Sequence, residues 1–103
     1  MKGYQLVFST LQNRQHHSGE NLIEWFEKSA QSLGIQGITV VNASKGIGRD
    51  GKWHSASFFE LAEQPIELIM NVTEAECEAL FTFLKEQNQQ IFYTKCAIEY
   101  GVI

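Results

Sequence analysis

A short segment around residues 45–54 carries the side chains best suited to bind a ligand. Its glycines and cations are interleaved, and they are Lys45, Gly46, Gly48, Arg49, Gly51 and Lys52. Glycine lets the backbone adopt positive φ and approach a ligand closely, and the cations suit an anion. The GK[ST] pattern of phosphate loops is absent; residues 46–51 have the spacing G-x-G-x-x-G, but a strand rather than a helix is expected after them, so they do not match a dinucleotide-binding site. The segment therefore predicts a surface contact loop, although a hairpin that binds nothing would have a similar composition.

Trp53 lies in the same loop, where no neighbouring apolar run predicts a core to bury it. A large exposed indole is typical of an anchor for a protein partner or a lid over a ligand, and packing within the loop is the alternative. We expect a partner to contact the end of the loop, which is formed by Lys52, Trp53, His54 and Ser55.

Two adjacent histidines, His16 and His17, precede the first expected helix. Neighbouring side chains point in different directions, so the pair needs a third metal ligand from elsewhere in the fold, either His54 or Glu20. A solvated loop, or an anion bound at the start of the helix, is the alternative interpretation. The set His16, His17 and His54 is thus a candidate metal site.

Length and composition indicate a single domain over residues 1–103. Hydrophobic residues make up 44% of the chain, which is enough for a core, and the net charge of −4 argues against a nucleic-acid or membrane-surface binder. Neither a signal peptide nor a membrane span is evident, so we expect a cytoplasmic protein. Cys77 and Cys96 lack metal-binding spacing and are expected to be buried thiols. No catalytic constellation is convincing, so we do not expect an enzyme.

Periodicity predicts six elements in the order β-α-β-β-α-β. A two-residue period favours strands and a 3.6-residue period favours helices. Gly34 is expected to end the first helix in a left-handed conformation. Thr73 and Glu76 form a capping-box pattern that starts the second helix. The expected elements are strand 4–9, helix 18–33, strand 35–43, strand 57–72 with a bend at 63–65, helix 73–88 and strand 91–98.

This order predicts an α+β, ferredoxin-like sandwich, in which two helices cover one face of a four-stranded antiparallel sheet. The second sheet face would normally be polar. Here residues 66–72 are apolar at both parities, and Val7, Val41 and Phe92 add to the uncovered side. An exposed face of that kind predicts a covering partner subunit in a closed symmetric assembly.

The chain resembles PII signal-transduction proteins over nearly its whole length. Residues 34–51 resemble their second strand and loop entry, residues 65–70 their third strand, and residues 90–93 the start of their fourth. A bacterial PII-like branch is similar in its His-Ser-Ala motif, here residues 54–56, and in its Phe-Tyr…Glu-Tyr-Gly ending. The resemblance implies a trimer with inward-facing sheets. It also implies adenine nucleotides in the clefts between subunits, and a loop that docks onto an enzyme or membrane transporter.

Carried over by position, the resemblance places Thr39, Gly46, Gly48 and Arg49 at the cleft and the loop base. Asp50 stands where PII proteins have a glutamine that helps to hold magnesium, and a carboxylate also suits that ion. With Lys45, the expected effector-binding set is Thr39, Lys45, Gly46, Gly48, Arg49 and Asp50.

The chain also departs from PII proteins. Residues 85–90 lack their second glycine-rich basic loop, residues 99–103 lack their two arginines, and residues 51–57 contain no tyrosine for modification. We therefore expect a reduced nucleotide site that takes a monophosphate or diphosphate. A metal-binding or metal-tolerance trimer that uses the histidines is the alternative, and an oligomeric module without a ligand is a third hypothesis.

Overall fold

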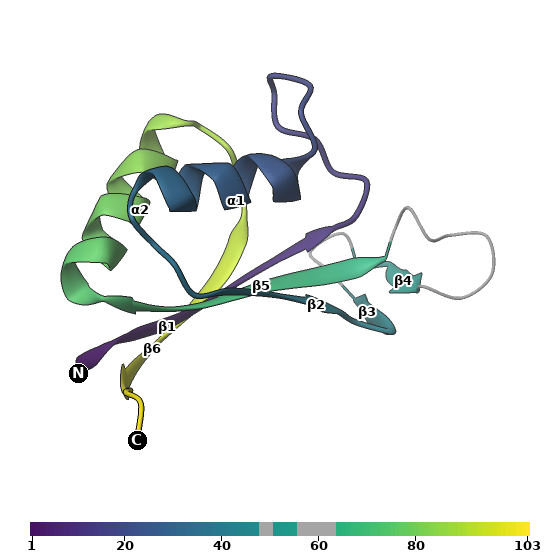
Figure 1. Ribbon diagram of the computed structural model, residues 1–103. Coiled ribbons are helices and arrows are strands. Elements are labelled where there is room, and N and C mark those ends of the chain that lie inside the picture. Colours follow the sequence, from purple (N-terminus) through teal and green to yellow (C-terminus); the bar gives the residue numbers. More distant parts are fainter. Residues whose placement is uncertain (48–50, 56–63) are drawn as a thin grey trace.

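The computed structural model describes residues 1–47, 51–55 and 64–103 (Figure 1). Four strands form an antiparallel sheet in the order β2-β5-β1-β6, and β3 and β4 form a separate hairpin. Both helices lie on the same face of the sheet, and the hairpin extends from the sheet end opposite both termini (Figure 1). The elements are β1 Lys2–Leu11, α1 Leu22–Ser32, β2 Ile38–Asn42, β3 Lys45–Ile47, β4 Trp53–Ser55, β5 Pro65–Thr73, α2 Glu74–Glu86 and β6 Phe92–Glu99.

The predicted ferredoxin-like architecture is confirmed, with differences at the element ends. The strand expected from residue 57 begins at Pro65, and residues 57–63 of that prediction lie outside the described residues. Helix α1 begins at Leu22 rather than near residue 18, because the Asn21 side chain caps it by accepting from the backbone N–H groups of Ile23 and Glu24. Gly34 follows the helix with a φ of +85°, as predicted.

The capping box that starts α2 is formed as predicted. The backbone N–H of Thr73 donates to the Glu76 carboxylate at 2.8 Å, and the backbone N–H of Glu76 donates to the Thr73 hydroxyl at 3.1 Å. These bonds satisfy two donors at the helix start. They also fix the point where β5 turns into α2.

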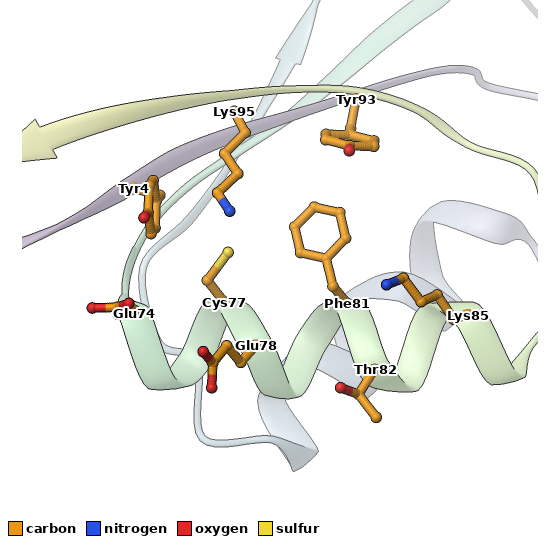
Figure 2. A pocket seen from close by; sticks show the side chains of 9 residues that line it. All are labelled: Tyr4, Glu74, Cys77, Glu78, Phe81, Thr82, Lys85, Tyr93 and Lys95. Carbon is orange, nitrogen blue, oxygen red and sulfur yellow. The ribbon is translucent and has the colours of Figure 1, made fainter.

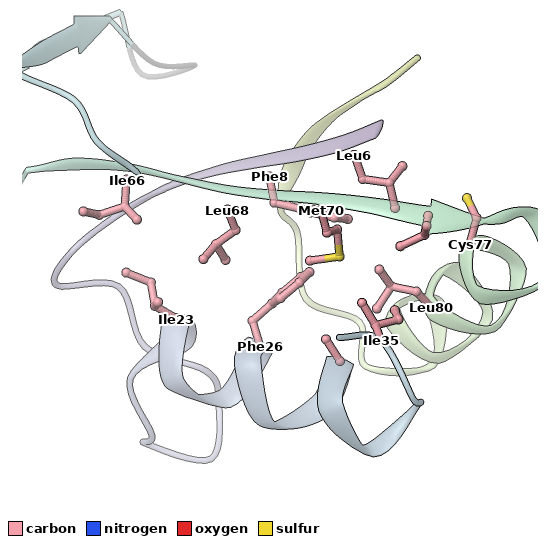
Figure 3. Close-up of a cluster of buried hydrophobic side chains, with 12 residues drawn as sticks. Leu6, Phe8, Ile23, Phe26, Ile35, Ile66, Leu68, Met70, Cys77 and Leu80 are labelled. Carbon is pink, nitrogen blue, oxygen red and sulfur yellow. The ribbon is translucent and has the colours of Figure 1, made fainter. Parts of the chain in front are cut away.

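The core lies between the sheet and the two helices (Figure 3). Alternate residues of β1 and β5, such as Phe8 and Leu68, point toward Phe26 of α1 and Leu80 of α2. The rings of Phe8 and Phe26 lie 4.6 Å apart between centroids. Each such buried side chain contributes about 1.5–3 kcal/mol, so this layer holds the sheet against the helices.

The opposite sheet face carries Val7, Val41 and Phe92 as expected, but the expectation that residues 66–72 are apolar on both faces is wrong: β5 presents Glu67, Ile69 and Asn71 there, and only Ile69 is apolar. Val7 pairs with Ile69, and the neighbouring pair Gln5–Asn71 is joined by a side-chain hydrogen bond of 3.2 Å. Phe92 lies at one end of this face and is 51% exposed. We call this surface the open face.

The prediction of two buried thiols is right for Cys77 and wrong for Cys96. Cys96 lies opposite Gln5 in the register of the edge strand β6, on the open face. The two-residue period of a strand shows that Cys96 lies on one of the two sheet faces, but it does not show which one. In a single chain the helices cover only one face, and Cys96 lies on the other.

Candidate functional site

The hairpin brings predicted effector and partner residues side by side. Lys45 pairs with Ser55, Gly46 with His54, and Ile47 with Trp53. The Lys45 ammonium lies 5.2 Å from the centroid of the Trp53 ring, whose side chain is 62% exposed. This is a cation–π contact between the effector set and the partner set. Three other predicted effector residues, Gly48, Arg49 and Asp50, lie outside the described residues.

A cavity of about 780 Å³ lies at the base of the hairpin. The antiparallel register creates it, since the end of β1 lies beside the starts of β5 and β6: Leu11 pairs with Pro65, and Ser9 pairs with Phe92. We call it the hairpin-base cavity. Its polar, charged and aromatic lining residues are Ser9, Thr10, Arg14, Lys45, Glu67, Gln90 and Phe92.

The hairpin-base cavity combines two cations with an unsatisfied hydroxyl. Arg14 Nη2 donates to the backbone carbonyl of Gln90, which connects the β1–α1 segment to the α2–β6 segment. Thr10 Oγ1 is buried and has no hydrogen-bond partner among the described residues. Buried hydroxyls are normally paired. The cavity can therefore offer an anion two positive charges and a hydrogen-bond donor.

Two of the predicted effector residues, Lys45 and Gly46, line this cavity, whereas Thr39 does not. Thr39 pairs with Ile69 and therefore lies on the open face. Sequence reasoning missed Arg14 as a site residue. The sequence held a signal for Arg14: the chain has only two arginines, and few cations lie in the expected loops other than the glycine-rich loop.

The histidine pair is built into the loop before α1. His16 is 6% exposed, its Nδ1 accepts from the backbone N–H of Ser18 at 3.2 Å, and its ring stacks on Trp25 at 4.1 Å between centroids. The His17 ring lies 4.0 Å from the His16 ring, measured between centroids. No group of three His, Cys, Asp or Glu side chains that could hold a metal occurs in the part of the chain that the structure describes. The stacking on Trp25 and the hydrogen bond from Ser18 give His16 a role in the packing of this loop.

A second cavity, of about 420 Å³, lies between α2 and β6 (Figure 2). The Lys95 ammonium lies 4.2 Å from the centroid of the Tyr4 ring and 5.9 Å from that of Phe81. Phe81 packs edge-on against Tyr93 at 4.8 Å. Burial raises the pKa of the Cys77 thiol, and nearby Lys95 opposes that shift only in part. The thiol is therefore protonated near neutral pH and is a poor nucleophile.

Solved structures define the class of fold. The chain has the fold of PII-like signalling proteins, with TM-scores of 0.67 and 0.64 to two of them. One is CPII from Thiomonas intermedia, a nitrogen regulatory PII-like protein bound to ADP, AMP and bicarbonate; it is 17% identical and the match covers 98% of this chain and 97% of CPII. The other is a candidate PII-like signalling protein from Thermus thermophilus, 14% identical, with 95% of this chain and 90% of that protein covered.

The apo form of CPII is also similar, at 18% identity and a TM-score of 0.51, with 95% of this chain and 92% of CPII covered. The sequence itself matches the family described as DUF190, Uncharacterized ACR, COG1993, over residues 7–100. The chain therefore belongs to the DUF190 family. No curated protein is similar enough in sequence to count as a relative. Neither described helix is long and apolar enough to cross a bilayer.

Proposed function

We propose that this chain is a PII-like regulatory protein that senses a small anionic effector, an adenine nucleotide or a similar molecule. The effector binds in the hairpin-base cavity near Lys45 and Gly46. The loop at residues 45–57 transmits the signal to a partner protein, an enzyme or a membrane transporter, in the cytoplasm. The protein is a regulator rather than an enzyme.

One observation carries this proposal: Lys45 belongs to the cavity and to the hairpin at once. Its side chain lines the cavity, and its ammonium also lies over the exposed ring of Trp53. A phosphate in the cavity would compete with the indole for that ammonium, because a charge-assisted hydrogen bond is stronger than an exposed cation–π contact. Binding would thus release or reorient Trp53, and a partner that grips Trp53 would respond.

The binding unit in this proposal is a homotrimer, with effector sites at the subunit clefts. The open face supports an assembly, since it presents Val7, Ile69, Val41 and Phe92 together. The sheet order leaves β2 and β6 as edge strands, and such edges are normally covered. The ADP and AMP bound to CPII support a nucleotide as effector, because the two chains share a fold.

Native mass spectrometry tests assembly and ligand together. The protein is sprayed alone and with AMP, ADP, ATP, cyclic AMP or zinc. We expect a trimer that gains nucleotide mass, with less gain for Lys45→Ala and Arg49→Ala variants, which should also lose partner binding. A trimer that ignores every nucleotide would refute the effector proposal, and uptake of zinc in that case would favour the metal-binding alternative based on His16, His17 and His54.

A further inference from the structure

The sheet end beside the hairpin-base cavity presents four of its lining residues in a fixed order. Glu67 of β5 lies opposite Ser9 of β1, and Ser9 lies opposite Phe92 of β6. Residues directly opposite each other in antiparallel strands share a sheet face, so these three form one row. Lys45 lies just past the end of β2, the strand on the other side of β5, and lines the same cavity. The order is therefore an aromatic ring, a hydroxyl, a carboxylate and a cation.

This order matches the parts of a nucleotide. An aromatic ring stacks on a base, and an ammonium group forms charge-assisted hydrogen bonds with phosphate. Three strand spacings separate β6 from β2, which amounts to roughly 14 Å, and a nucleotide can bridge such a span. A nucleotide with its base on Phe92 and its phosphates at Lys45 would have its sugar over the middle of the row, where Ser9 and Glu67 lie.

Glu67 offers the middle of the row an acceptor for sugar hydroxyls. Its side chain is half-buried and forms no ion pair with a residue that the structure describes. An ionised carboxylate only accepts hydrogen bonds, so it repels phosphate oxygens rather than binding them. Its two oxygens suit two neighbouring hydroxyls. Acidic side chains bind the ribose 2′-hydroxyl in dinucleotide-binding folds in this way.

Resting on the proposed function, we infer that Glu67 accepts hydrogen bonds from the ribose hydroxyls of the effector. The effector is therefore a ribonucleotide, bound across the sheet end with its base toward β6 and its phosphates toward β2. Glu67 determines specificity, because a sugar without these hydroxyls gains nothing to offset the repulsion between the carboxylate and the phosphates.

Isothermal titration calorimetry with ADP and 2′,3′-dideoxy-ADP tests this inference. The measured quantity is the ratio of the two dissociation constants, since a change in phosphate repulsion affects both ligands alike. The wild type is compared with Glu67→Ala, which removes the carboxylate, and with Glu67→Gln, which keeps one acceptor oxygen. Glu78→Ala is the matched control, because it removes a carboxylate at the other cavity. Thermal unfolding of each variant checks that it folds.

We expect the wild type to bind ADP at least about tenfold more tightly than 2′,3′-dideoxy-ADP, as for lost hydrogen bonds to a charged group. In Glu67→Ala the two ligands should bind equally, and in Glu67→Gln the ratio should be intermediate. Glu78→Ala should keep the wild-type ratio. Inosine diphosphate, which has the hydroxyls but lacks the adenine amino group, should respond to Glu67→Ala as ADP does.

Three results would overturn the inference. Equal binding of ADP and 2′,3′-dideoxy-ADP by the wild type would exclude recognition of the ribose hydroxyls. A wild-type ratio in Glu67→Ala would show that another group binds them. A preference for ADP over inosine diphosphate that Glu67→Ala abolishes would place the base, rather than the sugar, at this carboxylate. A wild type that binds no nucleotide would instead refute the proposed function itself.

Discussion

The hairpin-base cavity and the cavity between α2 and β6 differ in how their polar and charged groups are satisfied. At the cavity between α2 and β6, the Lys95 ammonium rests against aromatic rings, and two glutamates accompany two lysines in the lining. At the hairpin-base cavity, Lys45 lies over an exposed indole and the Thr10 hydroxyl has no partner among the described residues. Between these two cavities, the buried hydroxyl without a partner distinguishes the hairpin-base cavity as the candidate ligand site; His16 Nε2 is also buried without a partner among the described residues, but it lines neither cavity.

The largest effect expected to separate the cavities comes from the aromatic pair Phe81 and Phe92. Phe81→Ala should lower the free energy of unfolding by about 2–3 kcal/mol, below the usual cost for a fully buried ring because Phe81 is half-buried. ADP affinity should be unchanged. Phe92→Ala should cost less stability and weaken ADP binding by about 1–3 kcal/mol, as for loss of a base-stacking ring. Urea unfolding and calorimetry measure both.

An equal loss of ADP affinity in Phe81→Ala and Phe92→Ala would break the comparison, since both cavities would then affect the ligand. The Phe81→Ala measurement needs folded protein. Its far-ultraviolet circular dichroism should match the wild type before any titration.

The next largest effect comes from two lysines, Lys45 and Lys95, which line different cavities. Lys45→Gln should weaken ADP binding about tenfold, which corresponds to ~1.4 kcal/mol, because it removes one cation of the hairpin-base cavity. Lys95→Gln is the matched control at the other cavity, where loss of its exposed contacts with Tyr4 and Phe81 should lower stability by about 0.5–1 kcal/mol and leave ADP affinity unchanged. If Lys95→Gln were the variant that lost ADP, the functional assignment of the cavities would be reversed.

Two threonines, Thr10 and Thr82, allow the two cavities to be compared by the free energy of unfolding alone. Thr10→Val should raise the free energy of unfolding of the ligand-free protein by about 1 kcal/mol, because it removes a buried hydroxyl that has no partner among the described residues. Thr82→Val, at the exposed rim of the other cavity, should change stability by less than about 0.5 kcal/mol. A destabilised Thr10→Val variant would mean that the Thr10 hydroxyl already has a partner in the free protein.

The smallest effect is a pH dependence at the cavity between α2 and β6. The pKa of Cys77 is raised in the folded state, mainly by burial. Its contribution to stability is therefore fully present below the ordinary thiol pKa of 9.0 and is lost as pH rises through the folded value. Urea unfolding between pH 8 and 10 should show a steeper fall for the wild type than for Cys77→Ala. Parallel curves for the two proteins would contradict this.

Local signals in the sequence predicted much of the fold. The capping box of Thr73 and Glu76 needs residues only three apart, and the left-handed Gly34 needs only its own lack of a Cβ. The alternation in β5 likewise marks both sheet faces. The order β-α-β-β-α-β predicted the four-stranded sheet with two helices on one face, because ferredoxin-like elements pack in one common way.

The site was less predictable because its contacts are distant in sequence. Arg14 and Gln90 are 76 residues apart, so only the folded sheet brings them together. Thr10 lies just beyond the expected strand 4–9 and carries no signal of its own, and the lack of a hydroxyl partner among the described residues is visible only in three dimensions. Lys45 was predicted because it lies in the glycine-rich loop itself. Exposure of Cys96 depends on which sheet face a partner covers, which a single chain does not encode locally.

The most direct test of the account measures Trp53 emission while ADP is added. Trp25→Phe leaves Trp53 as the only tryptophan and keeps a ring to stack on His16. We expect a saturable change in emission as ADP draws the Lys45 ammonium from the indole, and none in the Trp25→Phe, Lys45→Gln double variant. If calorimetry shows ADP bound to the Trp25→Phe protein while its emission stays constant, the cavity and the hairpin are not coupled and the central claim is wrong.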